Sequence, residues 1–168
     1  MPPLKLPKDI VADPRHDALA DLLAAHPQPL WEGGRAAVTT LAPTPVLLAE
    51  LRGALAAGLA SQGLELIADK LAAEQKGLDA LRDKAPESPQ NARVSRLLFL
   101  ANDGSKRFYR DAEALLDRYP QRLLAVRLDL AGDALGEALF GSAKLVRAVL
   151  VMDKRVCARA LLGLLPAG

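Results

Sequence analysis

The sequence predicts an α/β fold: a small αβα sandwich with a mostly parallel sheet of three or four strands, preceded by a helical N-terminal region. Between Arg93 and Leu165, short apolar runs alternate with helix-like segments. Two of the runs, RLLFLA and KLVRAVLVM, are almost continuously apolar, as in strands covered on both faces. Between residues 44 and 84, leucines recur at the spacing of amphipathic helices.

The composition is that of a chain with a substantial core. It has 168 residues, of which 51% are hydrophobic and only 4% aromatic. The core must therefore be built from Leu, Val and Ala. The prolines lie mostly in the first 45 residues and around 86–89, outside the periodic segments, where proline is tolerated.

The charge is unevenly distributed along the chain. Residues 1–91 contain nine Lys and Arg against twelve Asp and Glu, whereas residues 92–168 contain 13 against eight. The basic excess of the second part indicates either an anionic partner or an ordinary solvated face.

The single cysteine, Cys157, excludes a disulfide framework and a cysteine metal cluster within the chain. The N-terminus lacks the apolar stretch of a signal peptide, and no run is long enough to span a membrane. We therefore expect a cytoplasmic protein without a membrane partner.

Residues 1–43 are predicted to form a proline-rich, loosely docked arm with one short helix over 16–26. The later part of the arm, 27–45, holds prolines and a Gly-Gly pair and is either a loop or a short edge strand. We interpret Trp31 as an anchor for this arm rather than a platform for a ligand.

Residues 44–84 are predicted to form a helical segment, a hairpin or a kinked long helix. Thr44 is a suitable N-cap, and Pro45 suits the first helical position. Gly58 and Gly63 interrupt the pattern, which favours two helices. Two apolar stripes result, formed by Leu48, Leu51, Leu55 and Leu59, and by Leu64, Ile67, Leu71, Leu78 and Leu81.

A linker is predicted at 85–92 (APESPQNA), and residues 93–168 form the α/β domain. Ser105 and Asp133 are candidate N-caps, and right-handed crossovers would place the helices on the faces of the sheet. We expect strands at 94–101, 122–128 and 145–152, and helices at 105–119, 133–140 and 154–165.

Three aspartates, Asp103, Asp129 and Asp153, each follow a predicted strand. In a parallel sheet the carboxyl ends of the strands share one edge, where three carboxylates could hold a divalent metal for phosphoryl chemistry. The alternative is that they cap the turns and helices that follow.

A cluster of cations with aromatic residues opens the helix predicted at 105–119. Lys106, Arg107 and Arg110 could contact phosphate while an aromatic side chain stacks on a base. The alternative is that Phe108 packs on the sheet and the cations face water. Cys157 lies in an apolar helical pattern with no histidine nearby, so we expect a buried thiol without catalytic activity.

The segment LGEALFG (135–141), followed by KLVRAVLVMD and KRVCARALLGLL, resembles the kink-turn RNA-binding ribosomal proteins of the L-seven-Ae and L-thirty-e type. RLLFLANDGS resembles their strand followed by an acidic turn, and the resemblance covers residues 93–165. It implies an RNA-binding domain whose loop 141–144 contacts RNA. The Gly-Asn-Glu helix start of that family is missing, and the nearest stretch, 63–70, lacks the Asn.

We therefore expect a non-enzymatic module that binds RNA or a ribonucleoprotein, without a cofactor, since no nucleotide-binding or nucleophile motif is present. The partner would be structured RNA, with phosphate contacts from Lys106, Arg107, Arg110, Lys144 and Arg147. The alternative is a scaffold or regulatory adaptor that binds another protein or a second copy through the stripes of 44–84. A small magnesium-dependent phosphoryl-transfer enzyme, built on the three aspartates, is the third hypothesis.

Overall fold

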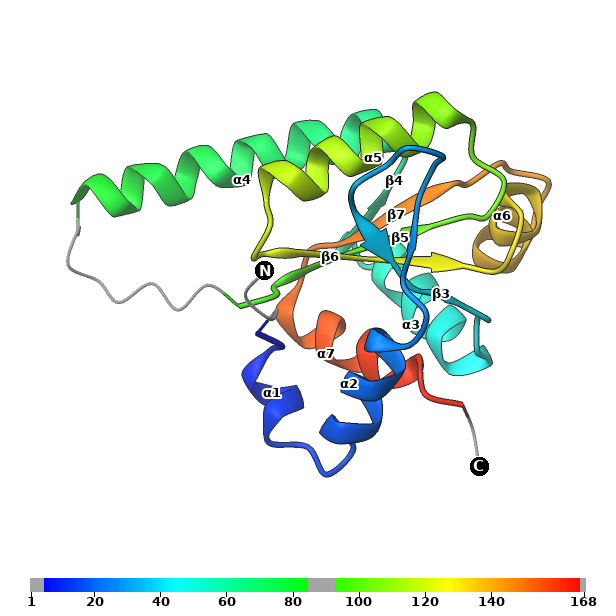
Figure 1. The fold of residues 1–168 in the computed structure, drawn as a ribbon, viewed down its shortest axis with the longest axis horizontal. Coiled ribbons are helices and arrows are strands. Elements are labelled where there is room, and N and C mark those ends of the chain that lie inside the picture. Colours follow the sequence, from blue (N-terminus) through cyan, green and yellow to red (C-terminus); the bar gives the residue numbers. More distant parts are fainter. Residues whose placement is uncertain (1–4, 85–92, 167–168) are drawn as a thin grey trace.

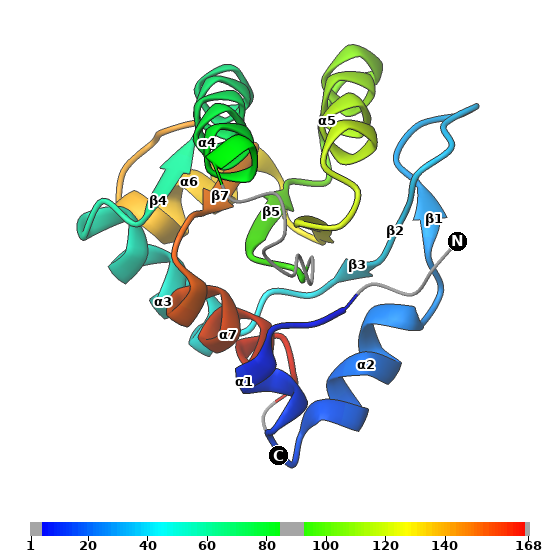
Figure 2. The ribbon, with the colours of Figure 1, turned by 90° about the vertical axis from the view of Figure 1, so that its left-hand side faces the viewer.

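The computed structural model describes residues 5–84 and 93–166, and it has the predicted α/β architecture in three layers (Figure 1). A five-stranded sheet lies between two groups of helices (Figure 2). Helices α1, α2, α3, α6 and α7 cover one face, and α4 and α5 cover the other. The helices are α1 (Lys8–Val11), α2 (His16–Ala24), α3 (Pro45–Ala56), α4 (Leu64–Lys84), α5 (Lys106–Arg118), α6 (Gly132–Phe140) and α7 (Lys154–Gly163).

The strands pair in the order β3-β6-β5-β7-β4, and a separate antiparallel pair is formed by β1 and β2. Strands β3, β6 and β5 are mutually parallel, whereas β7 is antiparallel to both β5 and β4. Four of the five strands therefore run in one direction, and β7 runs in the other. The strands are β1 (Gln28–Pro29), β2 (Ala37–Val38), β3 (Thr40–Leu41), β4 (Ala60–Gln62), β5 (Arg96–Leu100), β6 (Leu123–Leu128) and β7 (Ala148–Val151).

The sheet has more strands than the three or four expected because the N-terminal half contributes two. β3 adds to the edge beside β6, and β4 adds to the edge beside β7. Both are too short to leave a periodic signal in the sequence. The predicted apolar runs lie at the centre of the sheet, where every residue of β7 and all but Arg96 of β5 are buried.

Side-chain caps begin three of the helices. Thr44 accepts a hydrogen bond from the Leu47 amide, and Ser105 accepts one from the Phe108 amide, as predicted. Asp153 caps α7 by accepting from the amides of Arg155 and Val156. The N-cap predicted at Asp133 is wrong, because α6 begins at Gly132 and its N-cap residue is Ala131.

The N-terminal region is part of the same core as the later half of the chain. Leu6, Ile10 and Leu19 are buried in the cluster that contains Phe99 and Leu161. Residues 5–15 are therefore docked on the domain instead of being loosely attached. Residues 1–4 of the predicted arm lie outside the described residues.

The segment 44–84 contains two helices, as favoured by its glycines, with β4 between them. Gly58 and Gly63, on either side of β4, have φ values of +75° and +91°, which non-glycine residues rarely adopt. The linker predicted at 85–92 lies outside the described residues. Within the described ranges, 5–84 and 93–166, we find no helix with the length and apolarity needed to cross a membrane.

Two glycines of α6 let the chain that leads into β7 cross close to the helix. A Cβ atom on Gly136 would overlap the carbonyl oxygen of Lys144. One on Gly132, one turn earlier, would lie 2.8 Å from Cγ of Arg147. The path of residues 144–147 therefore depends on the absence of a side chain at these two positions.

We predict that Gly136→Ala destabilises the protein, although alanine is the better helix former by about 1 kcal/mol. Its methyl group would overlap the Lys144 backbone, and overpacking of this kind costs about 1–3 kcal/mol or more. Urea unfolding measures the change. Gly53→Ala in α3 is the matched control, because a methyl group there would meet no neighbouring side chain within 4 Å, and it should stabilise slightly. Equal effects of the two substitutions would contradict this account.

Candidate functional site

The five cations predicted as phosphate contacts lie at one end of the strands, beyond the carboxyl end of β5 and the amino end of β7. We refer to this end as an edge of the sheet. Lys106, Arg107 and Arg110 are in the first turns of α5, which follows the carboxyl end of β5. Lys144 and Arg147 precede β7, whose amino end pairs with the carboxyl end of β5 (Leu100 with Ala148). We call Lys106, Arg107, Arg110, Lys144 and Arg147 the cationic edge.

Arg147 is held at this edge by an aspartate. Its Nε lies 3.3 Å from Oδ1 of Asp103, and the Gly132 amide donates to the same oxygen at 2.9 Å. The Gly132 amide and the Arg147 guanidinium hold the pKa of Asp103 below its ordinary value. Asp103 therefore positions Arg147 and also neutralises part of its charge.

Lys144 lies against an exposed aromatic side chain. Its Nζ is 4.3 Å from the centre of the Phe140 ring at the end of α6. The Lys144 carbonyl packs on Gly136. The helix α6 therefore contacts both the backbone and the side chain of Lys144. Leu145, the next residue, is also exposed, and the loop presents one cation between two apolar side chains.

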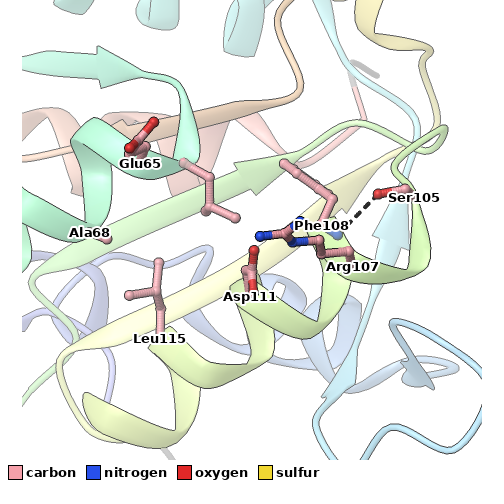
Figure 3. Close-up of a pocket in the computed structure, with 8 residues that line it drawn as sticks. Glu65, Ala68, Ser105, Arg107, Phe108, Asp111 and Leu115 are labelled. Carbon is pink, nitrogen blue, oxygen red and sulfur yellow. Dashed lines mark hydrogen bonds between the residues drawn. The ribbon is translucent and has the colours of Figure 1, made fainter.

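Arg107 faces a groove between the first turns of α4 and α5 (Figure 3). Apolar side chains of both helices line it. Asp111 lies beside Arg107 on α5, and Glu65 lies across the groove on α4 (Figure 3). Phe108 is half-buried in this groove, which agrees with the expectation that it packs inward. Arg107 remains exposed at the side of the groove.

Lys106 and Arg110 lie on the side of α5 that faces Trp31. The Lys106 Nζ is 5.4 Å and the Arg110 Cζ 5.6 Å from the centre of the indole ring. Trp31 packs against the core cluster beneath α5, in agreement with its expected role as an anchor.

The three aspartates proposed as a metal site do not converge. Asp153 follows β7, and because β7 is antiparallel to β5 it lies at the opposite edge of the sheet from Asp103. Asp129 accepts a hydrogen bond from the Asn102 side chain, and Asp103 is engaged with Gly132 and Arg147. Within residues 5–84 and 93–166, no three His, Cys, Asp or Glu side chains are grouped to hold a metal.

Sequence reasoning missed Glu113, which joins the arm to α5. Its side chain is only 5% exposed and accepts hydrogen bonds from the amides of Arg35 at 2.8 Å and Ala36 at 2.9 Å. The available signal was its position: Glu113 lies one turn after the buried Tyr109, on the apolar side of α5.

Arg127 near the end of β6 also went unnoticed. Its Nε donates to Oγ1 of Thr40 at 2.9 Å, and its Cζ lies 5.6 Å from the centre of the Tyr109 ring. The Tyr109 hydroxyl donates to the Ala101 carbonyl at 2.6 Å and accepts from the Gly104 amide. This chain of contacts fixes the loop after β5, from which α5 and its cations start.

Cys157 is buried, as expected, and its Sγ lies 3.3 Å from the Ser95 carbonyl. Burial raises the pKa of its thiol to about 12, so the thiol is protonated at neutral pH. A protonated, inaccessible thiol is a poor nucleophile.

No protein-family model matches the chain, and no curated protein is significantly similar to it.

We predict that Glu113→Ala destabilises the protein by about 1–3 kcal/mol, because it leaves two amides without their acceptor. Glu113→Gln keeps one carbonyl oxygen at the same place, so its free energy of unfolding should fall less than that of Glu113→Ala. Urea unfolding measures both variants, and amide hydrogen exchange at Arg35 and Ala36 reports on the arm. Unchanged exchange at these amides in Glu113→Ala would contradict the assigned role.

Proposed function

We propose that this protein is a non-enzymatic RNA-binding module that contacts structured RNA, alone or in a ribonucleoprotein, through the cationic edge. One observation carries the proposal. Two segments more than 30 residues apart bring five cations to a single edge of a rigid sheet. Cations fixed on a rigid frame suit phosphate groups at fixed spacing.

The exposure of these side chains supports the proposal. Lys106, Arg107, Arg110 and Lys144 are exposed, and Arg147 is partly exposed and paired with Asp103. Phosphates can approach the four exposed cations without displacing a buried group. The expected role is positioning of the RNA backbone, which is sequence-independent.

The resemblance to the kink-turn RNA-binding ribosomal proteins adds support. The order of elements from β5 to α7 (strand, helix, strand, short helix, strand, helix) is the order that the resemblance implies. Gly136 of the Leu-Gly-x-Ala motif is the residue that lets loop 141–147 pass against α6. The motif thus has a physical role at the loop that carries Lys144.

We predict that Arg107→Ala with Lys144→Ala weakens binding to a fluorescently labelled RNA hairpin with an internal bulge. The slope of log K against log salt should fall by about 1.4 to 1.8, since two phosphate contacts are lost. Fluorescence anisotropy at several salt concentrations measures both quantities.

The matched control is Lys154→Ala with Arg155→Ala, which removes the same charge at the start of α7, at the opposite edge of the sheet. This variant should keep nearly the full salt slope. Two equally weakened variants would mean that net charge alone attracts RNA. A flat titration of the wild type at low salt would sink the proposal.

We also predict that Asp103→Asn strengthens RNA binding. The amide oxygen can still accept from Gly132, while the charge that neutralises Arg147 is removed. The salt slope should rise by up to about 0.9, the value of one phosphate contact. Asp153→Asn is the control, because asparagine also caps helices well and the site lies at the opposite edge. An equal gain in the control would contradict the role of Asp103.

A second candidate function, self-association through α4, rests on a separate observation. The stripe of Leu64, Ile67 and Leu71 is covered by the domain, but its continuation at Leu78 and Leu81 is 38% and 63% exposed. The transition lies at Glu74, which binds Arg96 of β5, and at Gln75, which accepts a hydrogen bond from Arg122 just before β6. Beyond it the helix extends past the sheet (Figure 1).

If α4 pairs with a second copy, the wild type should be dimeric by size-exclusion chromatography with light scattering. Leu78→Glu with Leu81→Glu should then be monomeric, because charges would enter an apolar seam. Leu66→Glu is the control, since Leu66 is exposed on α4 outside the stripe. A monomeric wild type at high concentration would remove this candidate.

A further inference from the structure

Trp31 occupies a place on the surface that its anchoring role does not explain. It is the only tryptophan of the chain and lies in the connection between β1 and β2, next to α5. It is partly exposed, although it packs against the core cluster below α5.

The arm is held at this place by other groups. Leu30 and Val38, on either side of the connection, are each 4% exposed. Glu113 accepts from two amides of the connection, and Arg35 pairs with Asp117 at 3.0 Å. The indole Nε1 is buried and has no hydrogen-bond acceptor among the described residues, so the ring is held by packing and by the cations above it.

Two glycines lie close to the indole ring. Cβ atoms built on Gly33 and Gly34 would lie 3.2 Å and 3.0 Å from ring atoms. Larger residues at these positions would push the ring out of place. The ring therefore has a fixed position on the arm.

Two cations lie above the ring. Lys106 and Arg110 are exposed, and neither forms an ion pair within residues 5–84 and 93–166. They lie one helical turn apart and over the same ring. An aromatic ring below two exposed cations is a combination found in sites for single-stranded nucleic acid: the cations turn aside to bind the phosphates, and a base stacks on the ring.

We propose that Trp31 is a stacking platform for an unpaired RNA base, with Lys106 and Arg110 as the flanking phosphate contacts. The inference rests on the proposed function, because both cations belong to the cationic edge. It narrows the substrate to RNA that has unpaired nucleotides beside its structured part. Bases of a continuous duplex are stacked on one another and cannot reach the ring.

The single tryptophan makes the test direct, since emission excited selectively at tryptophan, without the two tyrosines, reports on Trp31 alone. An oligouridine and a fully paired RNA hairpin, both end-labelled, are titrated while anisotropy and tryptophan emission are recorded. Oligouridine should quench the emission in step with its anisotropy change. The paired hairpin should bind with little quenching.

Two substitutions separate stacking from anchoring. Trp31→Phe keeps an aromatic face and should keep most of the affinity for oligouridine. Trp31→Leu fills the same space without an aromatic face. Its affinity for oligouridine should fall by about 5- to 150-fold, the range for one stacked base. Thermal unfolding of both variants confirms that the arm remains docked.

The outcomes distinguish the two proposals. RNA binding with unchanged tryptophan emission, or equal affinities of Trp31→Phe and Trp31→Leu, would overturn the stacking role and leave the proposed function standing. No binding of either RNA at low salt would overturn both.

Discussion

The contact between α6 and the chain that returns from it determines how this molecule is organised. Gly136 leaves room for the Lys144 carbonyl, so the chain after α6 doubles back across the helix. It then enters the sheet as β7, antiparallel to β5 and β4. A side chain at residue 136 would displace the segment that leads into the most buried strand. One close backbone approach therefore fixes the path of the segment that carries Lys144 and Arg147.

The direction of β7 decides what chemistry the edge can support. It brings Lys144 and Arg147 beside the start of α5 and sends Asp153 to the other edge. The edge thus holds the five cations together with Asp103 and Asp129, and it lacks the third carboxylate proposed for a metal. The arm completes it, because Glu113 holds residues 35 and 36 on α5 and places Trp31 below Lys106 and Arg110. Parts of the chain that lie far apart in the sequence therefore contribute to this edge.

Local signals made much of the fold predictable from the sequence. The apolar runs of β5 and β7 and the N-caps Thr44 and Ser105 act over a few residues, and the helices and strands they define were predicted closely. Two- and three-residue strands such as β3 and β4 carry no such signal. The direction of β7 is set by its pairing with β5 and β4, which are distant in the sequence, and the partners of Glu113 lie 77 and 78 residues away. The sequence identified the cations individually. Their location at the same end of the sheet follows only from the strand pairing.

The central claim is that the edge formed by the start of α5 and the segment before β7 is the surface that binds RNA. Two-dimensional ¹H–¹⁵N NMR of the labelled protein, titrated with a bulged RNA hairpin, tests it most directly, because one spectrum shows the chemical shifts of the backbone amides throughout the domain. The account predicts shifts concentrated at residues 103–110 and 141–147, with α7 near Asp153 unaffected. Shifts concentrated around residues 153–159, or along the outer part of α4, would contradict it.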